Sequence, residues 1–116
     1  MRSTPRFLQG VYRFEGKGLD APALLDAALS YVVPDGVTMQ PVYLRAGNAA
    51  AELVCLVLVR DGRPMRYFPV GAKDGTHVAL RVVEDLEPGT SIELHAAAPA
   101  GVCATVVVDL GLVEIA

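Results

Sequence analysis

The stretch LVCLVLVRDGRPMRYFPV, residues 53–70, decides the fold class of this chain. Two runs rich in aliphatic and aromatic residues flank the pair Asp61-Gly62, and an Asp-Gly pair in that setting is a strong signal for a two-residue β-hairpin. Comparable turn sequences of Pro, Asp, Asn and Gly recur about every 11–15 residues between residues 34 and 101. This spacing is typical of a β-sandwich or a β-barrel.

The alternation of apolar and polar residues predicts two kinds of strand. Residues 77–83 and 91–97 alternate, which indicates one buried face and one solvated face. Residues 53–59 and 102–108 are apolar at nearly every position, so we expect both of their faces to be covered. Either residues 1–33 of the same chain or another subunit covers the second face. The residues that we predict for an oligomer interface are Val54, Leu56, Leu58, Cys103 and Val107.

The N-terminal segment differs in charge from the rest of the chain. Residues 1–19 contain four basic side chains and one acidic side chain, a local charge of +3, whereas residues 20–116 carry −6. Three aromatic residues in the segment make it more apolar than a solvated tail requires. We interpret it as a basic arm that docks on a partner or as an ordinary first strand over residues 9–15, and the two are compatible.

Residues 20–30, DAPALLDAALS, are the best helix candidate. Asp20 can cap a helix, Pro22 suits the first turn, and four alanines favour helix. Together the patterns predict an all-β domain over residues 20–116: an antiparallel, jelly-roll-like β-sandwich with a short helix near residues 20–30 and an arm or first strand over residues 1–19.

Composition excludes several classes of function. With 116 residues, 53% of them hydrophobic, the chain can bury a core and does not have the composition of a disordered protein. A net charge of −3 argues against nucleic-acid binding, and 6% aromatic residues without Trp argues against a stacking platform for sugars or bases. No run approaches the roughly 18 apolar residues of a membrane span, and the N-terminus does not have the apolar core of a signal peptide.

No constellation of catalytic residues emerges from the sequence. Nucleophile-elbow and phosphate-loop motifs are absent, and His77 and His95 do not have metal-ligand spacing. We therefore expect no enzymatic activity, no metal and no cofactor. Cys55 and Cys103 lie in Val-rich runs and are interpreted as small buried residues, with a disulfide as the alternative.

Three arginines, Arg60, Arg63 and Arg66, surround the Asp61-Gly62 turn. A charged hairpin tip either protects strand edges from association or docks on an acidic partner, because the guanidinium binds carboxylates in a fork geometry.

Residues 31–47, YVVPDGVTMQPVYLRAG, and residues 86–116, LEPGTSIELHAAAPAGVCATVVVDLGLVEIA, resemble small all-β structural proteins of tailed-phage virions. The resemblance covers about the last two-thirds of the chain, and it departs from the pattern at Asp35 and at residues 39–41, where Pro41 would interrupt a ladder bond. The matching positions are Tyr31, Val33, Pro34, Gly36, Asn48, Leu86, Pro88, Gly89, Ile92, Ala96, Ala98, Gly101, Val102, Val106, Gly111 and Glu114.

The resemblance implies a virion structural protein, assembled in the host cytoplasm and carrying no catalytic residues. We expect a capsid decoration (cement) protein that binds between subunits of the major capsid protein as a homo-oligomer, with a trimer favoured. The alternatives are a tail or fibre module that contacts a receptor, or a small-molecule-binding β-barrel. Neither nucleic acid nor membrane is an expected partner. The predicted partner contacts are Arg2, Arg6, Phe7, Tyr12, Arg13, Phe14, Arg60, Arg63 and Arg66.

Overall fold

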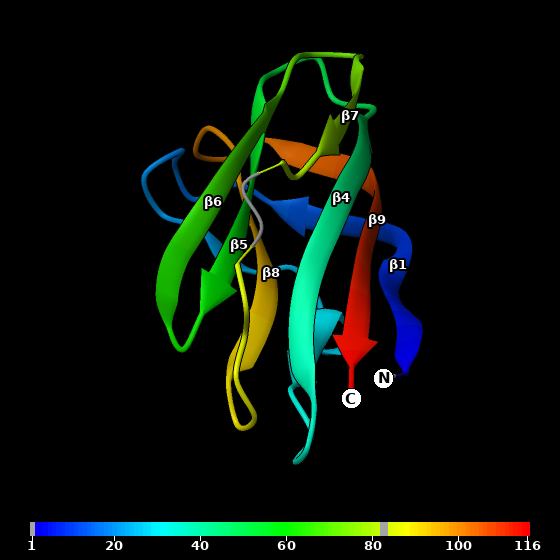
Figure 1. Ribbon diagram of the computed structural model, residues 1–116. Helices are drawn as coiled ribbons and strands as arrows, with labels where there is room; N and C mark the ends of the chain where they lie inside the picture. The colour runs from blue at the N-terminus through cyan, green and yellow to red at the C-terminus, as the bar shows by residue number, and fades with distance from the viewer. Residues whose placement is uncertain (1, 82–83) are drawn as a thin grey trace.

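Two antiparallel sheets packed face to face make up the protein (Figure 1). The structure is a computed structural model that describes residues 2–81 and 84–116. Sheet I contains, in spatial order, β1 (Ser3–Glu15), β9 (Cys103–Ile115), β4 (Thr38–Asn48) and β7 (Gly75–Ala79). Sheet II contains β6 (Arg63–Val70), β5 (Val54–Arg60) and β8 (Ser91–Ala97), and the short strands β2 (Ala23–Leu24) and β3 (Ser30–Val32) both pair with the far side of β8. The predicted all-β antiparallel sandwich is confirmed, and the chain forms two sheets rather than the alternative small-molecule-binding barrel.

The hairpin predicted from residues 53–70 joins β5 to β6. Asp61 and Gly62 have φ angles of 49° and 80°, the pair of positive values that a two-residue type I′ turn requires. The Asp61 carboxylate also accepts a hydrogen bond from the backbone N–H of Ser91 at 2.9 Å, which ties the turn to the start of β8. Local turn chemistry therefore determines the central hairpin of sheet II.

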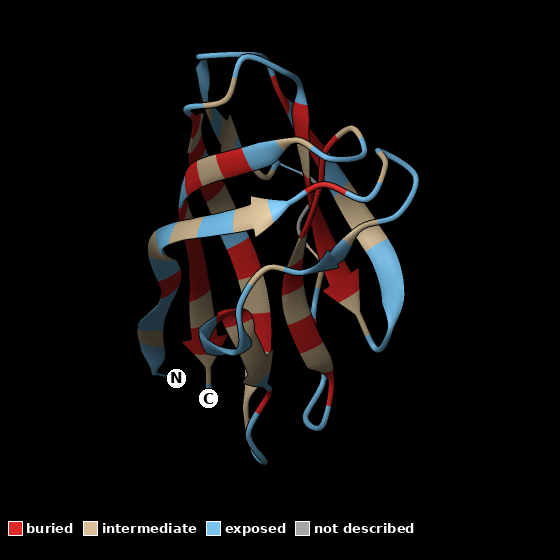
Figure 2. Ribbon diagram, turned by 180° about the vertical axis from the view of Figure 1, so that it is seen from behind, coloured by how far each residue is buried: buried red, intermediate tan, exposed pale blue. Residues whose placement is uncertain are grey.

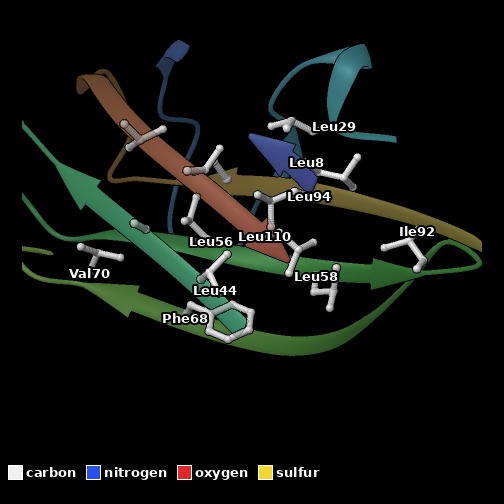
Figure 3. Close-up of a cluster of buried hydrophobic side chains, with 14 of the residues drawn as sticks. Leu8, Leu29, Leu44, Leu56, Leu58, Phe68, Val70, Ile92, Leu94 and Leu110 are labelled. Carbon is white, nitrogen blue, oxygen red and sulfur yellow. The ribbon is translucent and has the colours of Figure 1, made fainter. Parts of the chain in front are cut away.

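The core lies between the two sheets and is filled mainly by leucine (Figure 3). Leu44 and Leu110 from sheet I meet Leu56, Leu58 and Leu94 from sheet II, and all five side chains are fully buried. Burying a leucine side chain stabilises a fold by about 1.5–3 kcal/mol, so this layer is a principal source of stability.

The oligomer interface predicted on β5 is wrong. Val54, Leu56 and Leu58 point into the core of the same chain and are completely buried. The opposite face of β5 is covered within its own sheet: Val57 lies between Tyr67 of β6 and His95 of β8, and its exposed fraction is 1%. Apolar residues on both faces of β5 therefore do not require a second subunit.

The predicted helix over residues 20–30 is also wrong, because this segment pairs with β8 instead. Only one turn of 3-10 helix, η1 (Ala27–Leu29), separates β2 from β3. Asp26 rather than Asp20 caps this turn, and its carboxylate accepts a hydrogen bond from Ala28 N at 2.9 Å. An eleven-residue helix is marginal in water, whereas the edge of β8 offers the segment hydrogen-bond partners.

Residues 3–15 form an edge strand of sheet I rather than a detached arm. β1 pairs with β9 along its whole length, from Ser3 opposite Ile115 to Glu15 opposite Cys103, and Leu8 enters the core. The strand is longer than the predicted one over residues 9–15. Both β1 and β9 turn near their middles (Figure 1).

Two further sequence features have structural counterparts. The register of β4 with β9 shifts between Pro41 and Tyr43, a β-bulge that accommodates the missing N–H of Pro41. The strand expected over residues 77–83 corresponds only in part to β7, which ends at Ala79. Residues 82 and 83 lie outside the described part of the chain. In that described part, no helix is long and apolar enough to cross a membrane.

Candidate interaction surface

The outer face of sheet I presents a continuous surface to solvent. Because inward residues such as Leu8, Leu44 and Leu110 alternate with outward ones, the register places the outward residues of four strands in rows across the sheet. Three such rows are Phe7–Gly111–Tyr43–Ala79, Gln9–Asp109–Arg45–His77 and Val11–Val107–Gly47–Gly75.

Four polar and aromatic residues of these rows form an ordered group, which we call the Tyr43 cluster: Tyr43, Arg45, His77 and Asp109. Arg45 Nη2 lies 2.6 Å from Asp109 Oδ2, and the Tyr43 hydroxyl donates to Asp109 Oδ1 at 3.1 Å. The Arg45 guanidinium carbon lies 5.5 Å from the centroid of the Tyr43 ring, and the His77 ring meets that ring edge-on at 6.0 Å. Strands from three parts of the sequence thus hold one another's side chains in fixed orientations.

Asp109 is the electrostatic centre of the cluster. Partial burial and the hydrogen bond to Asp109 raise the pKa of Tyr43, and the bond to the same carboxylate raises the pKa of Arg45. Tyr43 therefore remains a neutral donor and Arg45 remains charged at physiological pH. Within the ion pair the charges of Arg45 and Asp109 offset each other, and the cluster is rich in donors and acceptors.

Gly111 allows the Tyr43 ring to lie against the sheet. A Cβ atom at residue 111 would lie 2.1 Å from Cε2 of Tyr43, a distance that no pair of non-bonded carbon atoms tolerates. The side chain missing at Gly111 is therefore replaced by the Tyr43 ring from the neighbouring strand, and the position of the ring depends on this glycine.

An open groove of about 830 Å³ runs beside the cluster. Gly47 and Gly75 are paired across β4 and β7, so its floor carries no side chains there. Gln9, Val11 and Val107 line the side nearer β1, and Arg45 and Asp109 of the Tyr43 cluster also line it. This volume falls in the range of small-molecule sites, and a lining that combines glycine and valine with Gln9, Arg45 and Asp109 suits an amphipathic ligand.

Large apolar side chains are exposed on the same face. Phe7 is 52% exposed, Val11 65% and Val107 52%, and the register places Val11 directly beside Val107. Aromatic residues and arginine are enriched in the buried centres of protein interfaces, and the exposed valines add apolar area beside them. This face is thus the best candidate for an interaction surface.

The structure separates the predicted N-terminal contact residues into two groups. Arg2, Phe7 and Arg13 are exposed, whereas Tyr12 and Phe14 point inward and pack against the core.

Arg6 also points inward and binds within the chain. Its Nε lies 2.6 Å from Oε1 of Glu114, and the Tyr31 hydroxyl donates to the same oxygen. Arg6 and then Tyr31 lower the pKa of Glu114 by stabilising its charged form, while burial raises the pKa of Tyr31. These three residues join β1 and β9 of sheet I to β3 of sheet II.

The three hairpin arginines lie on sheet II and not with the N-terminal residues. Arg60 Nη1 lies 3.7 Å from Glu84 Oε2, and Arg66 also pairs with the Glu84 carboxylate. Arg63 is exposed. One internal carboxylate therefore already binds two of the predicted partner contacts, so the hairpin tip presents less free positive charge than its sequence suggests.

The cysteines lie on different sheets and are free thiols. Cys55 is half-buried on β5, and burial raises its pKa. Cys103, expected to be buried, is exposed at the start of β9, so the alternative of a disulfide between the two does not describe the fold. In residues 2–81 and 84–116, no group of three or more His, Cys, Asp or Glu side chains has the arrangement of a metal site.

The sequence analysis named Phe7 as a partner contact and Val107 as an interface residue, but it missed the Tyr43 cluster. Two signals were available: Asp109 and Gly111 interrupt the apolar run of the last strand, and Tyr43, Arg45 and Gly47 alternate along β4. Neither signal shows that the two strands are neighbours, which only the register of β4 with β9 establishes.

No family model matches this chain. A search of curated proteins likewise finds no match. Among solved structures, the chain is similar to the CBM36-1 domain, a carbohydrate-binding module of a multidomain xylanase from the hindgut metagenome of Trinervitermes trinervoides. That similarity has a TM-score of 0.55 and 15% identity over 93% of this chain and 98% of that one.

The chain is also similar to part of a chain in two structures of infectious bursal disease virus. For the Gt strain the TM-score is 0.52 with 13% identity, over 97% of this chain and 33% of the viral chain. For the Gx strain the TM-score is 0.54 with 16% identity, over 98% of this chain and 32% of the viral chain. The present chain thus spans about a third of the viral chain. These similarities show a β-sandwich fold that is used both in a carbohydrate-binding module and in a virus particle.

Proposed function

We propose that this chain is a non-catalytic virion structural protein, a capsid decoration protein that attaches to the shell through the outer face of sheet I. The observation that carries the proposal is the concentration of exposed Phe7, Val11 and Val107 on one face, beside the ordered Tyr43 cluster. A rigid polar cluster next to exposed apolar side chains offers a partner both buried area and oriented hydrogen bonds.

Fold and charge support this proposal. The infectious bursal disease virus chains share the sandwich fold, and residues 31–47 and 86–116 resemble small structural proteins of tailed-phage virions. Exposed Arg13, an outward residue of β1, favours an acidic area of the major capsid protein beside the apolar contact. No cofactor, metal or chemical step takes part in this function, and the expected location is the virion.

Co-sedimentation of the purified protein with shells of the major capsid protein tests the proposal. Val107→Asp places a charge at the centre of the proposed contact. Val32→Asp is its matched control, because Val32 lies in a strand of sheet II and is 61% exposed, similar to the 52% of Val107. We expect Val107→Asp to lower occupancy about tenfold or more and Val32→Asp to leave it unchanged. Equal occupancy of the two variants, or no binding by the unaltered protein, would contradict the proposal.

The groove favours a second candidate function, glycan binding by a tail or fibre module. Its glycine floor and the donors and acceptors of Arg45, Asp109 and Gln9 suit the apolar face and the hydroxyl groups of a neutral sugar, and a carbohydrate-binding module has the same fold. Titration calorimetry of the isolated protein with xylo-oligosaccharides and other neutral glycans tests this candidate. Binding that Asp109→Asn abolishes would favour it, and the absence of heat with every glycan would exclude it for those sugars.

A further inference from the structure

The outer edge of β1 is the longest free strand edge in the described residues. No other described strand pairs with β1 on the side away from β9, and Figure 2 shows the strand exposed along most of its length. The other edges of the sandwich are shorter: β7 has five residues, and β6 has eight with two prolines, Pro64 and Pro69, whereas the thirteen residues of β1 include one, Pro5. An unpaired edge of this length is a template for another strand.

The backbone hydrogen bonds show which residues of β1 face the free edge. Arg2 exchanges both of its backbone hydrogen bonds with Ala116, at 2.9 and 2.8 Å, and Gly16 N donates to Val102 O at 2.7 Å. The register between these ends is unbroken, so the even residues of β1 bond to β9 and the odd residues direct their N–H and C=O groups outward. The Tyr12 hydroxyl contacts the outward C=O of Gln9 at 3.3 Å, and that oxygen keeps a second lone pair.

We propose that the free edge of β1 pairs antiparallel with β1 of a second copy of this chain, about a two-fold axis at Gln9. In this register Gln9 lies opposite the partner's Gln9, and Phe7 lies opposite the partner's Val11. All thirteen residues of the strand overlap, and the two most exposed apolar side chains of the strand cover each other across the axis. The result is one continuous eight-stranded sheet.

The apolar pair of Phe7 with the partner's Val11 selects this register over its neighbours. Here Arg13 lies opposite the partner's Pro5 and Glu15 opposite the partner's Ser3, so no like charges meet on the outer face. A shift of two residues in one strand would place Phe7 opposite the partner's Gln9 or Arg13 and lose the apolar pair. Pro5 and Arg13 are residues that protect an edge. In the proposed register they oppose each other, and the Pro5 carbonyl can still accept from the partner's Arg13 N–H.

Pairing of two copies would also complete the groove on the outer face of sheet I. The groove is bounded near β1 by Gln9 and Val11, the last residues before the free edge. In the pair, the partner's Phe7 stands directly beside Val11 and extends that side of the groove. The two grooves would then lie on one continuous sheet, related by the two-fold axis.

Charge-reversal variants test the register by sedimentation velocity over a range of concentrations. Residues 7 and 11 are four positions apart on one strand, whereas each lies directly opposite the other residue of the partner across the proposed axis. Phe7→Lys with Val11→Glu creates two opposite-charge pairs between copies. Phe7→Glu with Val11→Glu, and Phe7→Lys with Val11→Lys, create two like-charge pairs while removing the same apolar contacts.

We expect the unaltered protein and the Lys/Glu variant to sediment as dimers, with the Lys/Glu dimer weakened by salt. The Glu/Glu and Lys/Lys variants should associate about tenfold more weakly or worse, whatever their net charge. Circular dichroism confirms that each variant is folded, and Val32→Glu on sheet II controls for an exposed charge elsewhere. Equal association of all three double variants, or an unaltered protein that is monomeric or trimeric, would overturn the proposal.

Cross-linking gives an independent measurement. Opposed residues in a hydrogen-bonded antiparallel pair have Cα atoms about 5.5 Å apart, within the range of a disulfide. In a chain carrying Cys55→Ser and Cys103→Ser, we expect Gln9→Cys to form a covalent dimer on mild oxidation and Arg13→Cys to remain monomeric. Absence of the Gln9→Cys dimer, or equal cross-linking at both positions, would show that the strands do not pair about Gln9.

Discussion

Replacing Glu114 by glutamine should destabilise the fold by a predictable amount. The Glu114 side chain is only 9% exposed, and it accepts hydrogen bonds from Arg6 of β1 and Tyr31 of β3. A hydrogen bond to a charged group contributes about 1.5–3 kcal/mol, and the Tyr31 bond is of this kind. Arg6 is half exposed, so solvent screens its ion pair and the larger contribution comes from the Tyr31 bond. Because glutamine retains one acceptor oxygen, we expect Glu114→Gln to lower the free energy of unfolding by about 1.5–3 kcal/mol at pH 7.

The same carboxylate predicts how this loss depends on pH. The pKa of Glu114 is held below its ordinary value of 4.5 in the folded protein, so folding favours the charged form. Its contribution to stability is complete above the pKa of the unfolded chain and is lost as the pH falls through the folded pKa. The difference in stability between the unaltered protein and Glu114→Gln should therefore be largest near neutral pH and shrink below about pH 4.5.

Urea denaturation monitored by circular dichroism at pH 7, 5, 4 and 3 measures this difference. Glu52→Gln is the control, because Glu52 is an exposed carboxylate and its replacement should change stability by about 0.5 kcal/mol or less at each pH. If Glu114→Gln costs no more than this control, or if its cost is the same at every pH, Glu114 does not connect the two sheets as argued here.

The remaining predictions concern the core and the Tyr43 cluster. Leu56→Ala should lower the free energy of unfolding by about 2–5 kcal/mol in thermal melts, because Leu56 is completely buried. The control Val32→Ala should lower it by about 0.5 kcal/mol or less. Similar melting temperatures for the two variants would mean that Leu56 does not lie in the core. Gly111→Ala should displace the Tyr43 ring, lower the free energy of unfolding by about 1–3 kcal/mol and shift the NMR signals of Tyr43 and His77. An unchanged Tyr43 spectrum would refute the packing of the ring on Gly111.

The fold class could be predicted from the sequence because its signals are local. Asp61 and Gly62 adopt the positive φ angles that their chemistry favours, and the strand over residues 91–97 was visible as an alternation with period two. Such patterns depend on neighbours in the chain, which the sequence contains in full.

The incorrect predictions concern choices between equivalent local alternatives. Where every residue of β5 is apolar, alternation does not show which face meets the core, and Leu56 was assigned to the wrong one. Residues 20–30 have good helix formers, but they lie against β8, whose free edge supplies hydrogen bonds that a short isolated helix does not outweigh.

The sequence by itself determined that this chain forms an antiparallel sandwich with an apolar core, since turn chemistry and strand periodicity are properties of short segments. Only the tertiary structure decided where the interaction surface lies. Tyr43 and Asp109 are 66 residues apart in the sequence, and they meet because β4 pairs with β9 in one register. A shift of one residue would turn every side chain of a strand to the opposite face, so a site built from paired strands depends on contacts that no local pattern encodes.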